Sequence, residues 1–552
     1  MLVSTLISTI ALASVVVAVP VERGIPPTVI LPNGIFQGST SGNLTSFLGI
    51  PYAQPPVGKL RFAPPQAPSF SLAIKQATSF GASCIQQLDP FPPLFKRMEK
   101  RATNASEDCL FVNVIRPANI PFLKQLPVVF WIYGGKRNSG FEDGDSSNNP
   151  GNTVVQRSID LGEPVIYVSV NYRLNAFGFL PGKEVKAAGI GNIGLRDQRF
   201  ALEWVQKFIW EFGGDASKVT IWGQSAGAIS VALQMLTNDG NTQGLFRGAF
   251  MESGSPIPAQ DITTGQQYYD QLVQNTGCAS SSDTLECLRE VPVDTLVAAV
   301  NESPNLFAFQ SLTIAWKPLV DGVFLKRNPQ DSVAQGLYAK IPFVTGDVDD
   351  EGTIFSVGNK NITTDDEFAN YVKTNYVSGA TDAQVAQIVQ AYPSDPTAGS
   401  PYDTGTNNQL TPEFKRLASF QGDLVFQSTR RFFLQTASKT QNAWSYLYKR
   451  GKASPFFGAS HGSEVPEFYG ALGTDFIGTD ALVNFVNTLN PNGPKNSISL
   501  LSALDWPQWA SNSTAPPLLT FLDPAPSISI TPDTYRLEAM NVLIQISRAI
   551  IP

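Results

Sequence analysis

Residues 219–227 read Val-Thr-Ile-Trp-Gly-Gln-Ser-Ala-Gly, and this stretch of the 552-residue chain decides its fold. The apolar and β-branched residues before the first glycine predict a short buried strand over 218–223, and the small and apolar residues of 226–236 predict a buried helix. A strand that runs into Gly-x-Ser-x-Gly and then into a helix predicts a tight turn that exposes its serine, here Ser225. The alternative is an ordinary glycine-containing turn, but the flanking strand and helix favour the first interpretation.

The chain contains one histidine, His461, and this restricts the chemistry open to Ser225. A serine hydroxyl is a weak nucleophile, so a base must take its proton and a carboxylate must orient that base. Imidazole suits this role near neutral pH, and His461 is the residue that supplies it. The alternative is a surface histidine in a Gly/Ser-rich loop. The catalytic role is favoured because His461 is the single histidine of the chain and follows the predicted strand 443–449.

An acidic loop between Ser225 and His461 supplies candidates for the orienting carboxylate. Hydrolases with this serine turn carry the order serine, acid, histidine along the chain. The apolar segment 341–346 predicts a later strand, and an acidic run follows it. The competing interpretation is a solvated loop that caps the next helix. Residue chemistry alone leaves four candidates open, namely Asp347, Asp349, Asp350 and Glu351.

Ordered sequence blocks extend over nearly the whole chain. They are Phe-Leu-Gly-Ile-Pro-Tyr-Ala-Gln-Pro-Pro-Val-Gly at 47–58, Ser-Glu-Asp-Cys-Leu-Phe-Val-Asn-Val at 106–114, Asn-Tyr-Arg-Leu at 171–174, Gly-Leu-Arg-Asp-Gln at 194–198 and Phe-Gly-Gly-Asp at 212–215. In these blocks the chain resembles the type-B carboxylesterase/lipase family, which is the cholinesterase-like branch of the α/β-hydrolases. Within that family it resembles the fungal extracellular lipases most. The resemblance implies an α/β-hydrolase fold, in which helices flank a large, mostly parallel central sheet in one large domain.

The same resemblance implies a catalytic set and an activity. The family's Asp-Glu-Gly motif resembles 350–352 and selects Glu351, and its His-Gly-x-Glu motif resembles 461–464. We therefore expect a secreted serine hydrolase, a lipase or carboxylesterase, that cleaves carboxylic esters through an acyl-enzyme on Ser225 without a cofactor. The alternatives are a sterol or feruloyl-type esterase and, less favoured, a catalytically inactive cholinesterase-like binding protein. Gln224 is a departure, since the family usually has Glu before the nucleophile.

The segment after the predicted strand 128–133 departs most from the family pattern. The family has three consecutive glycines and an aromatic residue there. Its second and third glycines, with the residue after the nucleophile, donate backbone N–H groups to the oxyanion hole. This chain reads Gly-Gly-Lys-Arg-Asn-Ser-Gly-Phe over 134–141, so residues 136–139 are interpreted as an insertion or a misplaced splice boundary. The implied oxyanion-hole donors are Gly135, Gly140 and Ala226.

Four cysteines predict two disulfides in an exported chain, and they allow three connectivities. Local pairing is favoured and the resemblance implies the same pairs, Cys84 with Cys109 and Cys278 with Cys287. In related lipases the loop that corresponds to 84–109 is a lid over the acyl site. Here this lid-like loop is short and contains three prolines, which predicts a partly open site suited to esters in solution or micelles. A solvated surface loop is the alternative.

The amino end predicts export. Residues 2–17 form a long apolar run and Val-Val-Ala follows at 16–18, so we expect a signal peptide over 1–18 and a mature hydrolase domain over 19–552. The expected location is extracellular. Export predicts glycosylation at five Asn-x-Ser/Thr sites, which are Asn43, Asn104, Asn301, Asn361 and Asn512.

Charge and composition argue against several other classes. A formal net charge of -7 disfavours nucleic acid and anionic membranes as partners. One histidine and paired cysteines predict no metal site, and the sequence has no Walker-type phosphate loop. The carboxyl end, 535–552, predicts an amphipathic helix rather than a membrane span or lipid-anchor signal. The expected partners are an ester or lipid substrate and a lipid–water interface, and the oligomeric state stays open.

Overall fold

The computed structural model describes residues 25–88, 104–121, 124–135, 145–471 and 474–550. The strands within these ranges are β1 (Thr28–Leu31), β2 (Gly34–Gln37), β3 (Ser39–Ser41), β4 (Leu44–Pro51), β5 (Ile74–Gln76), β6 (Phe111–Pro117), β7 (Leu126–Ile132), β8 (Ile166–Val170), β9 (Gly214–Gln224), β10 (Gly248–Glu252), β11 (Phe343–Val348), β12 (Ala443–Tyr448), β13 (Pro517–Phe521) and β14 (Ile528–Pro532).

The helices over the same ranges are α1 (Asn152–Asp160), α2 (Asn175–Phe179), α3 (Lys183–Ala188), α4 (Ile193–Phe208), α5 (Ala226–Leu236), α6 (Gln266–Asn275), α7 (Thr284–Glu290), α8 (Val293–Asn301), α9 (Pro329–Ala334), α10 (Asp365–Tyr371), α11 (Asp382–Ala391), α12 (Phe414–Gly422), α13 (Ser428–Ala437), α14 (Val465–Tyr469), α15 (Ile477–Thr488) and α16 (Leu537–Ile550). Two π-helical segments, η8 (Val372–Tyr376) and η10 (Asp423–Gln427), continue α10 and α12.

A mixed sheet of 11 strands forms the centre, in the order β14-β13-β12-β11-β10-β9-β7-β8-β6-β4-β3. Neighbouring strands from β8 to β13 pair in parallel. Antiparallel pairing occurs only toward the two edges of this sheet, at β14 on one side and at β6, β4 and β3 on the other. The strands β1, β2 and β5 form a separate small sheet, in the order β1-β2-β5. The parallel centre brings the carboxyl ends of β7, β9, β10, β11 and β12 to one edge, where α/β sheets place their sites.

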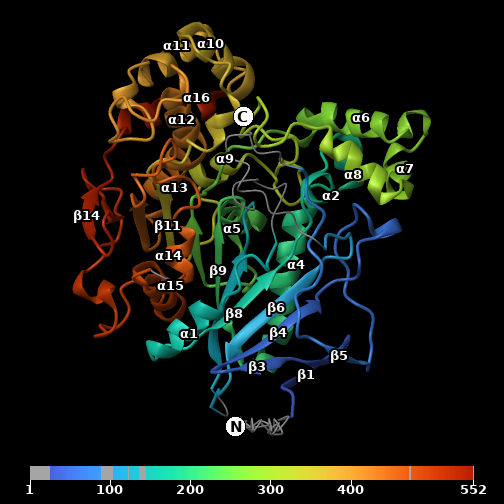
Figure 1. Cartoon of the computed structure of the whole chain (residues 1–552). Helices are drawn as coiled ribbons and strands as arrows, with labels where there is room; N and C mark the ends of the chain where they lie inside the picture. The colour runs from blue at the N-terminus through green and yellow to red at the C-terminus, as the bar shows by residue number, and fades with distance from the viewer. Residues whose placement is uncertain (1–24, 89–103, 122–123, 136–144, 472–473, 551–552) are drawn as a thin grey trace, which may run out of the picture.

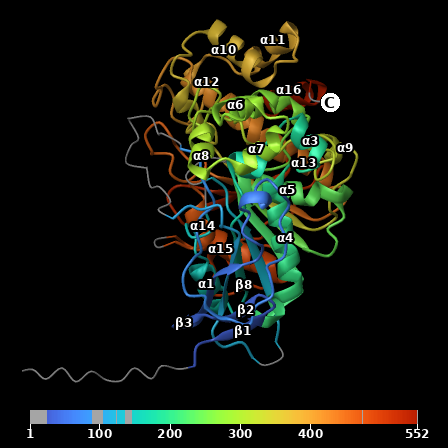
Figure 2. The ribbon, with the colours of Figure 1, turned by 90° about the vertical axis from the view of Figure 1, so that its right-hand side faces the viewer.

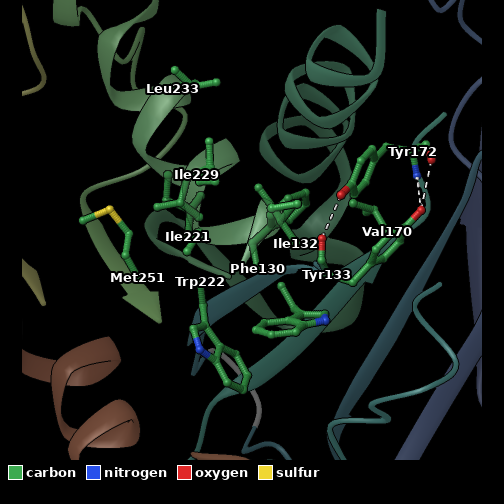
Figure 3. Packing of buried hydrophobic residues seen from close by; sticks show 14 of the residues in the cluster. Phe130, Ile132, Tyr133, Val170, Tyr172, Ile221, Trp222, Ile229, Leu233 and Met251 are labelled. Carbon is green, nitrogen blue, oxygen red and sulfur yellow. Dashed lines mark hydrogen bonds between the residues drawn. The ribbon is translucent and has the colours of Figure 1, made fainter. Parts of the chain in front are cut away.

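Helices cover both faces of the central sheet. Figures 1 and 2 show α1, α14 and α15 on one face and α4 and α5 on the other. The middle strands are consequently buried on both sides, as β7 and β8 are along their whole length, and they consist mostly of apolar residues. Figure 3 shows Ile221 and Trp222 of β9 packed beside Phe130 and Ile132 of β7. This core fixes the strand ends that carry the site.

Two disulfides are present, between Cys84 and Cys109 and between Cys278 and Cys287. The middle of the lid-like loop 84–109 lies outside the described residues. Four of the five sequon asparagines have exposed side chains, whereas Asn301 is partly buried and accepts a hydrogen bond from the backbone N–H of Leu88. Asn301 is therefore the least accessible of the five sites.

Candidate active site

Ser225 lies in the tight turn between β9 and α5. Its backbone adopts φ 57° and ψ -125°, a strained conformation for a residue with a Cβ. A Cβ on Gly227 would lie 2.0 Å from the carbonyl oxygen of Ile132, and a Cβ on Gly223 would lie 2.5 Å from the backbone of Gly227. Both positions therefore require glycine, and the segment has the geometry of a nucleophile elbow rather than of an ordinary turn.

Neighbouring strand ends close around this elbow. The backbone N–H of Ser225 donates to the carbonyl of Glu252 at the end of β10. A Cβ on Gly134, which follows β7, would lie 2.8 Å from Ser225 Cβ, and a Cβ on Gly254 would lie 2.7 Å from the Ser225 carbonyl oxygen. The side chain of Ser225 is only 5% exposed. The serine is thus held rigidly at the carboxyl edge of the sheet.

His461 and Glu351 form a buried pair at the same edge. Nδ1 of His461 lies 2.5 Å from Oε2 of Glu351, and the two side chains are 0% and 1% exposed. The other carboxylate oxygen of Glu351 accepts the backbone N–H of Val348 at 2.8 Å. This arrangement fixes the ring with Nδ1 on the carboxylate, so Nε2 is left as the proton acceptor.

The three aspartates of the acidic loop have other partners. Asp347 pairs with Arg430 at 2.8 Å, and Lys452 Nζ lies 2.7 Å from both Asp349 and Asp350. These ion pairs leave the fourth carboxylate of the loop, Glu351, on the imidazole. The side-chain geometry therefore agrees with the family resemblance, since both select Glu351 as the carboxylate that orients His461.

Two aromatic rings and one amide surround the imidazole. The ring centroids of Phe426 and Phe355 lie 4.6 and 5.0 Å from that of His461. Nε2 of His461 lies 3.5 Å from the side-chain Nε2 of Gln224, the residue before Ser225. Nε2, the ring nitrogen that is not on Glu351, therefore lies beside the residue that precedes Ser225, on the side of the ring where a general base for Ser225 is needed.

Burial dominates the electrostatics of the pair. It lowers the pKa of His461 to about 4, mainly because the imidazolium loses its hydration, although the charges of Glu464 and Asp347 act in the opposite direction. Burial also raises the pKa of Glu351, whereas the hydrogen bonds to its carboxylate from the backbone N–H of Val348 and from Nδ1 of His461 act in the opposite direction. The low dielectric disfavours the imidazolium, so His461 is available as a neutral base well into the acidic range.

A second pair of buried carboxyl groups, Glu252 and Glu464, lies behind the site. Glu464 accepts hydrogen bonds from Ser253 Oγ at 3.0 Å and Gln224 Nε2 at 3.2 Å, and Glu252 accepts one from Trp222 Nε1 at 2.5 Å. Burial, with the nearby Glu351 charge, raises the pKa of Glu464 to about 7; burial and the Glu464 charge raise that of Glu252. Sequence reasoning missed Glu252, although a charged residue at the end of the buried strand β10 was an available signal.

The proposed oxyanion-hole donors are only partly within the described residues. Ala226 is the first residue of α5, so its N–H has no partner inside the helix. Gly135 follows Gly134 directly, and Figure 3 shows the preceding Tyr133 fixed by reciprocal hydrogen bonds with Tyr172. Gly140 and the interpreted insertion, 136–139, lie outside the described residues. The complete set of donors therefore stays a prediction.

Other binding chemistry finds little support in the described part of the chain. No cluster of three or more His, Cys, Asp or Glu side chains there has the arrangement of a metal site. Residues 189–194 read Gly-Ile-Gly-Asn-Ile-Gly, but they follow helix α3 instead of a strand and so lack the context of a dinucleotide-binding loop. None of the described helices is long and apolar enough to cross a membrane.

Comparison with known proteins gives one consistent result. The model of the carboxylesterase family matches residues 26–528. The chain is 39% identical to Secreted lipase 1 of Botryotinia fuckeliana (strain B05.10), over 92% of this chain and 94% of that protein. It is also 39% identical to Secreted triacylglycerol lipase LIP1 of Gibberella zeae (strain PH-1), over 95% and 90%.

The fold comparison agrees. Among solved structures, Aspergillus niger EstA superposes with a TM-score of 0.81 at 27% identity and covers 96% of this chain and 99% of its own. The α/β-hydrolase fold predicted from the sequence is thereby confirmed. The chain belongs to the carboxylesterase family and is a carboxylic-ester hydrolase.

Proposed function

We propose that Ser225, His461 and Glu351 are the catalytic triad of this esterase. The observation that carries the proposal is the placement of His461, the one imidazole in the chain. Its Nδ1 lies on Glu351 and its Nε2 faces the residue before Ser225. With no second histidine to serve as base, the general-base role falls on this residue.

The reaction follows from this geometry. Ser225 Oγ attacks the ester carbonyl carbon while its proton passes to Nε2 of His461, and the backbone N–H of Ala226, with those of Gly135 and Gly140, stabilises the oxyanion. His461 then protonates the departing alkoxide, which leaves as the alcohol, and the acyl group stays on Ser225. Water attacks the acyl carbonyl and gives its proton to His461. That proton returns to Ser225 as the carboxylic acid departs.

We further propose that the substrates are lipid esters and that the protein is secreted from the cell. The relatives are named secreted lipases, one of them a triacylglycerol lipase. Residues 1–18 are proposed as the signal peptide and 19–552 as the hydrolase domain, with loop 84–109 as a short lid and glycans on the exposed sequons. Amino-terminal sequencing of the exported protein tests the cleavage site.

A panel of p-nitrophenyl esters of increasing chain length, measured below and above micelle formation, tests the activity. The proposal expects hydrolysis that Ser225→Ala and His461→Ala each reduce by several orders of magnitude, and Glu351→Gln by roughly 10⁴. Ser217→Ala, a change at an exposed serine on the same strand, is the matched control. Normal turnover in His461→Ala would contradict the triad. A preference for sterol or feruloyl esters would favour those esterases, and no hydrolysis anywhere would favour a binding protein.

A further inference from the structure

A cavity of about 420 Å³ lies beside the candidate active site. Its walls come from α6, the segment 310–319, η8, η10 and the last turns of α16, at the end of the molecule where Figures 1 and 2 show α6 and α16. Part of its wall is apolar, with Ile257, Leu312 and Val425. The cavity therefore has room and apolar surface for a medium-length hydrocarbon chain.

The cavity contains an uncompensated positive charge. Lys317 lines it, and among the described residues no hydrogen bond or ion pair reaches the Lys317 ammonium group. None of the described residues that form the wall is an aspartate or a glutamate. Lys317 is partly buried, and its loss of hydration lowers its pKa. A partly buried ammonium group without a counter-ion is costly, and a bound anion would remove that cost.

A hydrogen-bond donor without a partner lies in the same wall. Ser547, on α16, is 5% exposed, and its hydroxyl has no hydrogen-bond partner among the described residues. Native proteins satisfy nearly all such buried polar groups. The ammonium group and the unpaired hydroxyl suit a carboxylate, and the apolar wall suits a hydrocarbon chain. An organic carboxylate with a hydrocarbon chain combines the two.

The cavity shares its walls with the catalytic neighbourhood. Val425 lines the cavity, and the next residue, Phe426, packs on the ring of His461. Leu312 also lines it, and the preceding Ser311 donates a hydrogen bond to the carbonyl of Phe355, the second ring on His461. A ligand in the cavity would thus contact residues that are adjacent in the chain to Phe426 and Ser311. Phe426 packs on the His461 ring, and Ser311 binds Phe355, which also packs on it.

We propose that this cavity binds the carboxylate group of an amphipathic organic acid, with Lys317 as its counter-ion and the Ser547 hydroxyl as a hydrogen-bond donor. Two sources of that carboxylate are chemically equivalent. It belongs either to the free fatty acid that ester hydrolysis releases or to the far end of an acyl group that carries a second carboxylate. The assignment of a source rests on the proposed esterase function, whereas the binding site itself does not.

Calorimetric titration with octanoate and with octanol, a neutral ligand of equal length, tests the site. The proposal expects octanoate to bind about tenfold more tightly than octanol, as expected for one charge-assisted hydrogen bond. Lys317→Met should remove that difference and Lys317→Arg should restore it. Lys207→Met, a change at an exposed lysine on α4, is the matched control and should keep it. Equal binding of octanoate and octanol to the native protein, or an undiminished difference in a folded Lys317→Met variant, would overturn the site.

Kinetics distinguish the two sources. If the carboxylate belongs to the substrate, Lys317→Met lowers about tenfold the ratio of kcat/KM for the mono-p-nitrophenyl ester of suberic acid to that for p-nitrophenyl octanoate. If it belongs to the released acid, the ratio stays and the inhibition constant for octanoate rises about tenfold. No change in either quantity would exclude both sources of the carboxylate, and the calorimetric result would then decide the binding site by itself. If the native protein hydrolyses no ester, the proposed function fails, but the calorimetric result still decides the site.

Discussion

At the scale of single residues, the burial of His461 sets the pH range of the reaction. The sequence alone predicts an ascending limb of kcat/KM near the unperturbed pKa of about 6.5, because burial and the charge of Glu351 oppose each other. In the structure burial dominates and lowers the pKa to about 4. A lowered pKa keeps the imidazole neutral, and hence active as a base, at lower pH.

We therefore expect kcat/KM for a soluble ester to rise with pH through one ascending limb whose midpoint lies below 6.5. The measurement is a pH–rate profile of the native enzyme, with enzyme stability checked at each pH. A midpoint at or above 6.5 would contradict the dominance of burial over the neighbouring carboxylate charges at His461.

Gln224 offers a second test at this scale, because its side chain lies 3.5 Å from Nε2 of His461 and carries no charge. Gln224→Glu places a carboxylate there, which stabilises the imidazolium and raises the pKa of His461. The ascending limb should move up by about one pH unit. Gln387→Glu, a change at an exposed position of α11, is the control and should leave the profile unchanged. A limb that stays in place in the folded Gln224→Glu variant would contradict this electrostatic assignment.

At the scale of secondary-structure elements, the local sequence pattern correctly predicted the strand and the helix that flank Ser225, because both lie in one continuous segment. The helix predicted over 226–236 is α5, and the strand predicted over 218–223 lies within the longer β9. Residue chemistry could not choose among the four acidic candidates, because their partners Arg430 and Lys452 come from distant segments. Glu252 did have a local signal, a charged residue at the end of the buried strand β10, but its relation to Glu464 depends on tertiary packing.

The segment after β7 determines whether the oxyanion hole is complete. If residues 136–139 separate the oxyanion-hole donors Gly135 and Gly140, one donor is displaced, and a lost donor costs about 10² to 10³ in rate. Deletion of the four residues should raise kcat roughly tenfold or more, as measured on a soluble ester. Alternatively, mass spectrometry of the native protein will show the four residues absent. A native protein that contains them, with a folded deletion variant that is no faster, would show that the loop already supplies its donor.

At the scale of the whole molecule, a buried ion network joins the edge of the sheet to the catalytic region. Asp533, just after β14, contacts Arg430 and Arg431 of α13, and Arg430 also binds Asp347 at the end of β11. These charged side chains are almost fully buried. Removal of one charge from such a network leaves its partners uncompensated.

Asp533→Asn should therefore reduce the free energy of unfolding by about 3 to 5 kcal/mol. Urea denaturation of the native and variant proteins measures the change. Asp505→Asn, which removes an exposed ion pair with Lys495, is the control and should have little effect. A loss as small as that of the control would mean that the buried network contributes no net stability.

The central claim is that Ser225 is the acyl-accepting nucleophile, and covalent labelling tests it most directly. A fluorophosphonate reacts with an activated serine and stays attached, so peptide mass spectrometry of the labelled native protein identifies the residue. We expect one phosphonyl group per chain, located on Ser225, together with loss of esterase activity and strongly reduced labelling in His461→Ala. Labelling of a different residue, or full ester hydrolysis by a protein whose Ser225 has been replaced by alanine, would contradict the account.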